Sequence, residues 1–199
     1  GLYENGLQRA RFIPAIKAVE ANTRVLNVDS GIDYRLRVLS QSELYFVRTH
    51  APMSQEASEI LQRLFSDLSG GKQPEPSALI VNHRTLQALG VSEGVLLADF
   101  KTLCLEPRSA ADYTQLAKEF HSVLIDNVPE LTPEIADGAR RFITLIDEFY
   151  DRNIKVALVA ERPMASLYSG KKLGFEFQRT LSRLIEMQSV EYLGREHLP

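Results

Sequence analysis

The chain has 199 residues, of which 44% are hydrophobic and 25% charged, with a formal net charge of −3 at pH 7. This length and composition suit a globular protein with a sizeable core, built as one large or two small domains. Because the net charge is slightly negative, the sequence gives no overall positive potential that would attract nucleic acid or an anionic membrane. No apolar run marks a membrane-spanning segment, and no signal peptide marks an exported one.

The chain before residue 70 predicts helices and short strands. Apolar residues at helical spacing predict a helix over 7–21, and β-branched residues predict a strand over 24–28. Two further extended pieces are expected at 33–37 and 44–47.

A second helix is expected over 55–68, with Ser54 as its N-cap and an apolar stripe on one face. The following residues, 70–76, contain only Gly, Lys, Gln, Pro and Glu, which is typical of a linker. We therefore expect two regions, 1–69 and 77–199, on either side of it.

After this linker, strands are predicted at 78–81 and 94–97, with a polar turn region between them. A helix over 110–120 follows, with Ser109 as its N-cap. The single cysteine, Cys104, excludes an internal disulfide framework and favours a reducing compartment. Its apolar surroundings predict a small buried side chain.

The clearest unit is a strand, a helix and a second strand. Residues 121–128 form a buried-strand pattern, a helix begins after Thr132 and runs to about Arg152, and a second buried strand is expected over 155–160. Short links make this a right-handed crossover with parallel strands. The predicted fold class is therefore α/β, with a parallel βαβ unit in residues 121–161.

No phosphate-binding cradle is present in the sequence. The pattern G-x-x-x-x-G-K-[ST] does not occur, and Gly70-Gly71-Lys72 has neither its spacing nor a preceding strand. No metal site is predicted, because the four histidines have no ligand spacing; they are His50, His83, His121 and His197.

Asp126 has two interpretations. It ends a predicted buried parallel strand, where a Walker B aspartate would hold magnesium. The next residue is Asn127, however, rather than the glutamate that would activate water. The alternative is that Asp126 caps a local turn or pairs with a nearby arginine, and for catalysis we favour this alternative.

Arginines are the stronger signal, because a guanidinium stays charged and its planar fork suits a phosphate. Arg9 and Arg11 follow an Asn5-Gly6 turn signal and precede an apolar run. They are two residues apart, so on a helix only one of them can point at a given ligand.

Arg179 and Arg183 lie four residues apart on an amphipathic helix predicted over 175–189. They could reach a nucleotide together, as the arginines of a sensor-2 helix do. The alternative is a pair of surface arginines bridged to Glu176 or Glu186.

Several motifs together resemble the ZapE-type (Afg-like) AAA+ ATPase family. The first is Leu-Tyr-x-Asn-Gly-Leu-Gln-Arg-x-Arg-Phe, which is similar to the segment that follows sensor 1 in that family. The similar segments are 2–16, 27–35, 100–104, 111–113, 124–129, 139–147 and 175–187.

The resemblance implies the C-terminal part of a P-loop AAA+ ATPase-like fold that begins just after sensor 1. The Walker A, Walker B and sensor-1 segments would then lie upstream of Gly1, ATP and Mg2+ would be bound in the intact protein, and the fragment would be inactive alone. By carry-over, Arg9 is the preferred arginine finger with Arg11 second, and Arg179 is the preferred sensor-2 residue with Arg183 as its partner.

The resemblance also implies partners and a compartment. Bacterial members of the family associate with the division machinery and its FtsZ ring, and mitochondrial relatives act in inner-membrane protein quality control. We therefore expect self-association, contact with FtsZ or membrane-associated proteins, and a cytoplasmic or matrix-side location. The alternative function is a catalytically silent module for protein interaction or oligomerisation.

Overall fold

The computed structural model of the chain describes residues 9–23, 34–48 and 54–199. It divides into two compact units, Gly1–Asp33 and Tyr34–Pro199. The described element of the first unit is helix α1 (Arg9–Asn22), which contains Pro14. The helix predicted in this region is confirmed, whereas the strand predicted over 24–28 lies outside the described residues.

The second unit is built on a six-stranded sheet with the order β1-β6-β5-β4-β3-β2. Neighbouring strands from β1 to β4 in this order are parallel, and β3 and β2 continue the sheet in antiparallel fashion. The strands are β1 (Tyr45–Val47), β2 (Ser77–Val81), β3 (Arg84–Ser92), β4 (Val95–Asp99), β5 (Ser122–Val128) and β6 (Lys155–Ala160).

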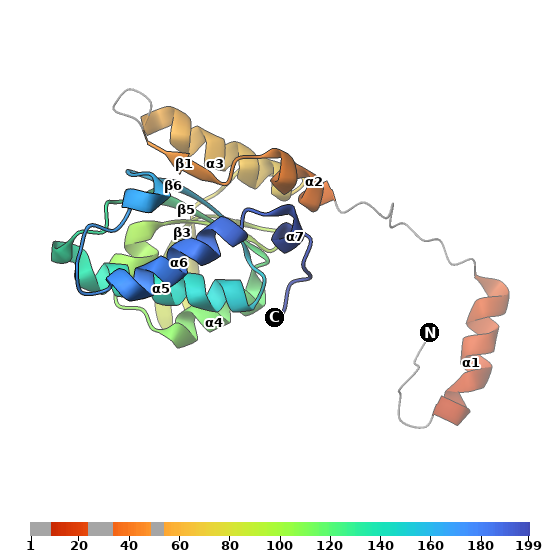
Figure 1. Cartoon of the computed structure of the whole chain (residues 1–199). Helices are drawn as coiled ribbons and strands as arrows, with labels where there is room; N and C mark the ends of the chain where they lie inside the picture. The colour runs from red at the N-terminus through yellow and green to blue at the C-terminus, as the bar shows by residue number, and fades with distance from the viewer. Residues whose placement is uncertain (1–8, 24–33, 49–53) are drawn as a thin grey trace. The chain divides into compact units, whose positions relative to one another are not determined.

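Helices cover both faces of this sheet (Figure 1). Buried residues of α2 and α3 pack on one face, and those of α4, α5 and α6 pack on the other, while α7 adds Leu193 to the first cluster and Tyr192 to the second. The helices are α2 (Tyr34–Gln41), α3 (Ser54–Leu68), α4 (Ala110–Glu119), α5 (Ala136–Asp151), α6 (Gly174–Glu186) and α7 (Val190–Leu193). Short π- and 3-10-helical segments lie at Lys101–Leu105, Pro133–Ile135 and Met164–Ser166. None of the described helices is long and apolar enough to cross a bilayer.

The predicted βαβ unit is confirmed. β5 and β6 are adjacent and parallel, and α5 connects them across one face. The start of the helix differs from the prediction, because Thr132 and Pro133 open a 3-10 turn and α5 begins only at Ala136. All six residues of β6 are buried, as expected for a parallel strand covered on both sides.

The hairpin strand β3 was not predicted. It occupies most of the region expected to be a polar turn, and its buried residues alternate with exposed ones. Two-residue turns join it to β2 and β4, and all four turn residues have positive φ: Asn82 (46°), His83 (64°), Glu93 (49°) and Gly94 (75°). Such turns match the twist of a hairpin, so Asn82 and Gly94 were the available signals.

The prediction of an extended piece at 33–37 is wrong for residues 34–37, which belong to helix α2. The alternation of polar and apolar residues there suggested a strand. Leu36 and Leu39 instead pack against the apolar cluster that α3 and α7 form on the sheet. Tertiary contact therefore decides the conformation of this short segment.

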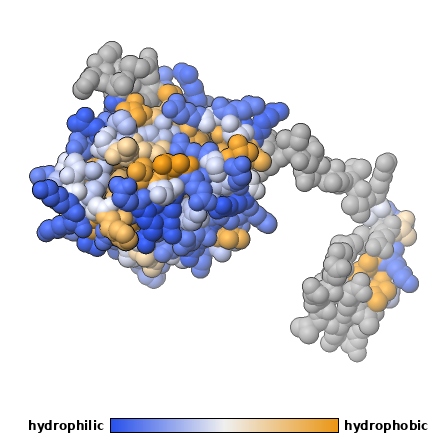
Figure 2. All heavy atoms as spheres, viewed as in Figure 1, coloured by the Kyte–Doolittle hydropathy of each residue, from blue (hydrophilic) through white to orange (hydrophobic). Residues whose placement is uncertain are grey.

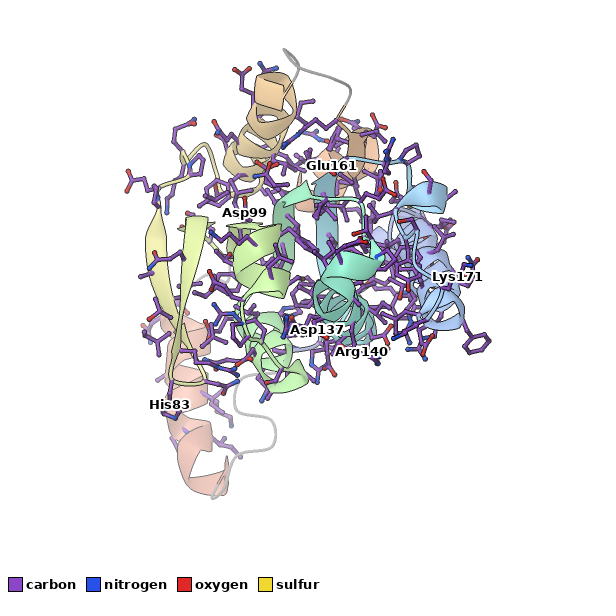
Figure 3. All side chains as sticks on the ribbon, turned by 90° about the vertical axis from the view of Figure 1, so that its left-hand side faces the viewer. His83, Asp99, Asp137, Arg140, Glu161 and Lys171 are labelled. Atoms are coloured by element: carbon purple, nitrogen blue, oxygen red, sulfur yellow. The ribbon has the colours of Figure 1, made fainter. Side chains whose placement is uncertain are left out.

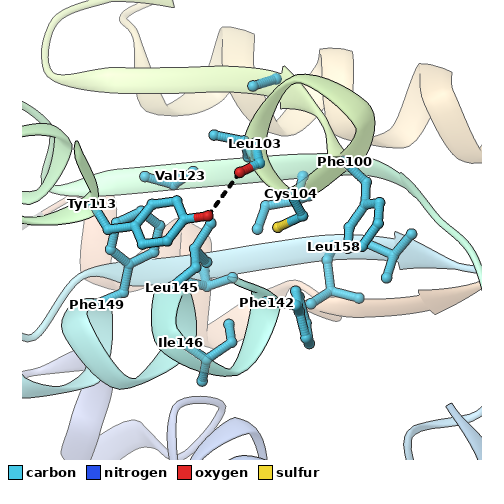
Figure 4. Close-up of a cluster of buried hydrophobic side chains, with 14 of the residues drawn as sticks. Phe100, Leu103, Cys104, Tyr113, Val123, Phe142, Leu145, Ile146, Phe149 and Leu158 are labelled. Atoms are coloured by element: carbon cyan, nitrogen blue, oxygen red, sulfur yellow. Dashed lines mark hydrogen bonds between the residues drawn. The ribbon is translucent and has the colours of Figure 1, made fainter. Parts of the chain in front are cut away.

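Cys104 lies in the core between the sheet and α4 and α5 (Figure 4). Phe100 contacts Phe142 with ring centroids 5.9 Å apart. The Tyr113 hydroxyl donates a hydrogen bond to the carbonyl oxygen of Leu103, at 2.8 Å. Cys104 is fully buried and burial raises the pKa of its thiol, so the expectation of a small buried side chain is confirmed.

Residues 70–76 connect α3 to β2 inside the second unit. Pro74 packs so closely on β3 that a Cβ added at Gly90 would lie 2.6 Å from its Cβ. Residues of α3 contact β4, β5 and β6, so elements from both sides of this segment share one core. The division into regions 1–69 and 77–199 remains a prediction.

Candidate functional site

The carboxyl ends of the parallel strands form the edge of the sheet where α/β proteins bind ligands. After β1 the chain continues to α3 on one face, and after β6 it continues to α6 on the other. Such a change of direction between adjacent strands makes a crevice at their carboxyl ends. Figure 3 looks onto this side of the molecule, with Asp99 and Glu161 labelled at the ends of β4 and β6.

The centre of this edge is an ion pair between Arg48 and Asp126. Arg48 follows β1, and its backbone N–H donates to the Ala160 carbonyl oxygen of β6 at 2.7 Å. Its Nη2 atom reaches past β6 to Oδ1 of Asp126 on β5, at 3.0 Å. The Asp126 side chain is only 9% exposed. The pair therefore links two strands that are not neighbours.

A bulge at the end of β5 positions Asp126 and Asn127. The pairing of β5 with β6 shifts between Ile125 and Val128, and Asn127 adopts a left-handed conformation with φ 58°. This conformation turns the Asn127 side chain toward β4, where Nδ2 donates to Oδ2 of Asp99 at 2.6 Å. The Asn127 backbone N–H donates to Oδ1 of Asp126 at 2.8 Å.

Charged residues continue along the edge beyond β6. Oε2 of Glu161 accepts a hydrogen bond from the Glu130 backbone N–H at 3.0 Å. The carboxylate of Glu130 is bound by Nε of Arg162 at 2.8 Å, and this hydrogen bond lowers the pKa of Glu130. The hydroxyl of Tyr45 donates to the Arg162 carbonyl oxygen at 2.6 Å, which ties the loop after β6 to β1.

These contacts support the structural interpretation of Asp126. It pairs with an arginine and accepts the N–H of the next residue, and both features belong to the structural alternative. Among the described residues, no group of three or more His, Cys, Asp or Glu side chains could hold a metal ion. We therefore derive no catalytic step through Mg2+ here.

Arg179 and Arg183 meet at one carboxylate. Nη2 of Arg179 lies 2.5 Å from Oδ2 of Asp147 on α5, and Nη1 of Arg183 binds the other oxygen of the same group. The Arg183 guanidinium also covers the Tyr150 ring, 4.7 Å from its centroid. Each arginine is thus bridged, but to α5 rather than to Glu176 or Glu186.

The two arginines differ in exposure. The Arg179 side chain is 56% exposed and the Arg183 side chain 21%. Arg179 can therefore exchange its partner for a ligand at a smaller loss of packing. That Arg179 and Arg183 contact a nucleotide remains a prediction.

Arg9 and Arg11 lie in the first turn of α1. Their side chains are outside the part of the chain that the structure describes, so their contacts are not placed. Helix α1 and the carboxyl edge belong to different compact units.

Sequence reasoning did not single out Arg48 or Asp99. Arg48 is separated from Asp126 by 78 positions, and no local pattern indicates a contact over that distance. The available signal was positional, because both residues come shortly after a predicted strand and parallel strands end at a common edge.

Comparison with known proteins gives a consistent result over nearly the whole chain. The model of the family described as AFG1-like ATPase matches residues 1–196. The chain is 48% identical over 197 residues to the Escherichia coli K12 protein named cell division protein ZapE, covering 99% of this chain and 52% of that protein. The chain thus spans about half the length of the bacterial relative that it matches.

More distant relatives match over similar spans. The Danio rerio protein named lactation elevated protein 1 homolog B is 31% identical over 226 residues, covering 96% of this chain and 44% of the relative. A Schizosaccharomyces pombe protein described as uncharacterized is 31% identical over 221 residues, covering 96% and 48%. No solved structure matches the chain. The resemblance found in the motifs is therefore confirmed, and the chain belongs to the family of AFG1-like ATPases.

Proposed function

We propose that the chain serves ATP hydrolysis by supplying arginines to a nucleotide whose phosphates are held elsewhere. The observation that carries this proposal is the match to an ATPase family over residues 1–196 of a sequence without a phosphate-binding cradle. Without backbone amides and a lysine arranged around a triphosphate, these residues have no means of holding it by themselves. We therefore expect the isolated chain not to hydrolyse ATP.

Arg9 is our preferred arginine finger, with Arg11 as the second candidate. Its place in the first turn of α1 supports this choice, because a side chain at the start of a helix can project from a rigid element. An arginine finger stabilises the charge that develops on the transferred phosphoryl group and does little for binding in the ground state. Its effect should therefore fall on turnover.

The test is Arg9→Ala in the full-length protein, with Arg11→Ala as the matched variant. We expect Arg9→Ala to leave the Kd for ATP within about twofold and to lower kcat by about a thousandfold or more. Arg11→Ala should reduce kcat much less. Unchanged turnover in Arg9→Ala would remove this residue from the site, and a larger loss in Arg11→Ala would exchange the two roles.

Arg179 is our preferred sensor-2 residue, and its exposure supports this choice over Arg183. In the proposed arrangement the Arg179 side chain leaves Asp147 when ATP is present, while Arg183 stays on Asp147 and Tyr150. Arg179→Ala in the full-length protein should then weaken ATP binding. An unchanged Kd for ATP would show that Arg179 binds Asp147 and does not contribute to nucleotide binding.

The name of the Escherichia coli relative supports a role in cell division for bacterial members. We propose that the intact protein self-associates and acts on division proteins such as FtsZ or on membrane-associated proteins. Co-sedimentation of the full-length protein with FtsZ polymers tests the bacterial case.

A catalytically silent interaction module is the second candidate. It is favoured by large apolar side chains exposed on α6 and α7: Phe175 (88%), Ile185 (58%) and Val190 (60%). Figure 2 shows apolar surface on the side that α6 crosses in Figure 1. Calorimetric titration of this chain with ATP and magnesium tests the silent module. Binding would contradict the silent module and would also reveal a nucleotide site within these residues.

A further inference from the structure

A small pocket lies between the start of α4 and the first two turns of α5, outside the carboxyl-edge site. Its volume is about 240 Å³, which is below the range of pockets that hold drug-sized ligands. A pocket of this size suits a small ion or the end group of a larger molecule. The lining residues are Arg108, Ser109, Ala110, Tyr113, Asp137, Arg140, Arg141 and Thr144.

The lining of this pocket is positively charged. Three arginines face a single aspartate, Asp137, which gives a formal charge of +2. Glu106 pairs with Arg108 at 3.0 Å, but it does not line the pocket. The pocket therefore attracts anions in a protein whose net charge is −3.

Two of the arginines are held in place by the fold. The Arg108 side chain is 2% exposed, and it donates to the carbonyl oxygens of Thr102 at 3.0 Å and Thr85 at 2.8 Å. Arg141 donates to the carbonyl oxygen of Cys104 at 3.1 Å. Because these acceptors are backbone atoms of neighbouring elements, both guanidinium groups are positioned before any ligand arrives.

The third arginine has no partner in the described structure. The Arg140 guanidinium forms no hydrogen bond or ion pair with any residue that the structure describes, and the side chain is exposed. Asp137 lies one helical turn away on α5 (Figure 3) and forms no ion pair with Arg140. The hydrogen-bond donors of the Arg140 guanidinium are therefore available beside two fixed positive charges. This group can bind a ligand without first breaking a hydrogen bond.

Ser109, the N-cap of α4, lines this pocket, whereas the Asp112 carboxylate of the same capping box is held by other groups. The Asp112 carboxylate accepts from Arg84 at 2.5 Å and from Asn82 at 3.1 Å, and it does not line the pocket. It also accepts from the Ser109 backbone N–H at 2.6 Å and from the Ser109 hydroxyl at 3.0 Å, so all the contacts named for this carboxylate are with the protein.

We propose that this pocket binds a phosphate group, either as the free ion or at the end of a small phosphorylated molecule. Guanidinium groups bind phosphate oxygens through pairs of parallel hydrogen bonds, and arginines outnumber carboxylates in the lining of this pocket. Arg140 closes over the bound group, while Arg108 and Arg141 supply the fixed charge beneath it. This site is independent of the proposed role of Arg9.

The test is a titration of the chain with inorganic phosphate by calorimetry, at constant ionic strength maintained with chloride. A parallel titration uses glucose 6-phosphate as a phosphomonoester. We expect saturable binding of at least one of them, and a Kd raised about tenfold or more by Arg140→Ala. Tighter binding of the ester identifies a phosphorylated molecule as the ligand, and tighter binding of the ion identifies free phosphate.

Arg63→Ala is the matched control, because Arg63 is an exposed arginine on α3 outside the pocket. It removes the same charge and should leave the Kd unchanged. Thermal unfolding checks that both variants are folded. The proposal is overturned if neither probe shows saturable binding, if Arg140→Ala binds as tightly as the unmodified chain, or if Arg63→Ala weakens binding to the same extent.

Discussion

At the scale of single residues, Asp112 shows how one buried carboxylate secures several elements. It is completely buried, and it accepts hydrogen bonds from the Ser109 N–H, the Asn82 amide and the Arg84 guanidinium. It thereby caps α4 and attaches the β2–β3 hairpin to the start of that helix. Burial alone would raise the pKa of Asp112, but these hydrogen bonds and the charge of Arg84 outweigh burial and lower it.

Asp112→Asn should lower the free energy of unfolding by about 2 kcal/mol near neutral pH, because charged hydrogen bonds in a buried site are lost. The lowered pKa fixes the sign of the pH dependence. The contribution is fully present above the ordinary pKa of 3.8 and is lost as the pH falls through the lowered value of the folded state.

Urea unfolding of the two proteins across this pH range measures the difference. The difference in the free energy of unfolding between the unmodified chain and Asp112→Asn should become smaller as the solution becomes more acidic. Asp67→Asn, at an exposed carboxylate on α3, is the control and should change stability by less than about 0.5 kcal/mol. A difference in the free energy of unfolding that grows in acid would contradict the lowered pKa of Asp112.

The residue scale also shows what the sequence could not indicate. The alternatives for Asp126 included an arginine partner, but nothing in the sequence identified Arg48 as that partner, because the contact depends on how the strands are ordered in the sheet. Likewise Arg179 and Arg183 were correctly placed on one face of a helix, yet their common acceptor, Asp147, belongs to another element. Spacing predicts neighbours on a helix and not the group that faces them.

At the scale of elements, the contact between α5 and α6 depends more on Arg183 than on Arg179. Arg183 binds Asp147, lies 3.5 Å from Asp151 and covers the Tyr150 ring. Arg183→Ala should therefore cost about 1–2 kcal/mol of stability, and Arg179→Ala less than about 0.5 kcal/mol, because exposed ion pairs contribute little.

A double-mutant cycle with Asp147→Ala measures both couplings from urea unfolding. The coupling of Arg183 with Asp147 should exceed that of Arg179. Equal couplings, or a larger one for Arg179, would contradict the view that Arg183 is the structural member of the pair.

The close approach of the 70–76 segment to β3 gives a second prediction at this scale. Gly90→Ala would bring a Cβ to within 2.6 Å of the Pro74 Cβ and 3.3 Å of the Phe65 ring. Because the Pro74 ring is rigid and its segment is packed, we expect Gly90→Ala to lower the free energy of unfolding by about 1–3 kcal/mol. Thermal unfolding measures it.

Gly174→Ala is the matched control. Gly174 opens α6 and has nothing within 4 Å of the added Cβ. Alanine at this position should be neutral or stabilise the protein by about 0.5 kcal/mol, since it restricts the unfolded chain. If Gly90→Ala were as stable as Gly174→Ala, the 70–76 segment would not be packed against β3 in solution.

Elements with strong local periodicity were predictable and those set by tertiary contact were not. The apolar stripe of α5 and the continuous apolar run of β6 identified the βαβ unit. Strand β3 has only alternate inward residues, and α2 is eight residues long, so neither carries enough local signal. Their conformations follow from the sheet that each one joins or covers.

At the scale of the whole molecule, the chain combines membership of an ATPase family with a sequence that has no triphosphate cradle. At the carboxyl edge, the described Arg48 pairs with Asp126 and Asn127 donates to Asp99. The proposed contribution to ATP turnover therefore comes from arginines that reach a nucleotide held by other residues. Arg9 is the most important of these.

The most direct test of this account is a subunit-mixing experiment with the full-length protein. Subunits carrying Arg9→Ala are combined with subunits whose ATP site has been disabled, and ATP hydrolysis is measured across mixing ratios. Each variant alone should be inactive, and the mixture should recover activity, because the disabled subunit still offers Arg9 to the intact ATP site of its neighbour. A mixture that stays inactive, although the variants assemble together, would contradict the assignment of Arg9 as a finger that acts between subunits.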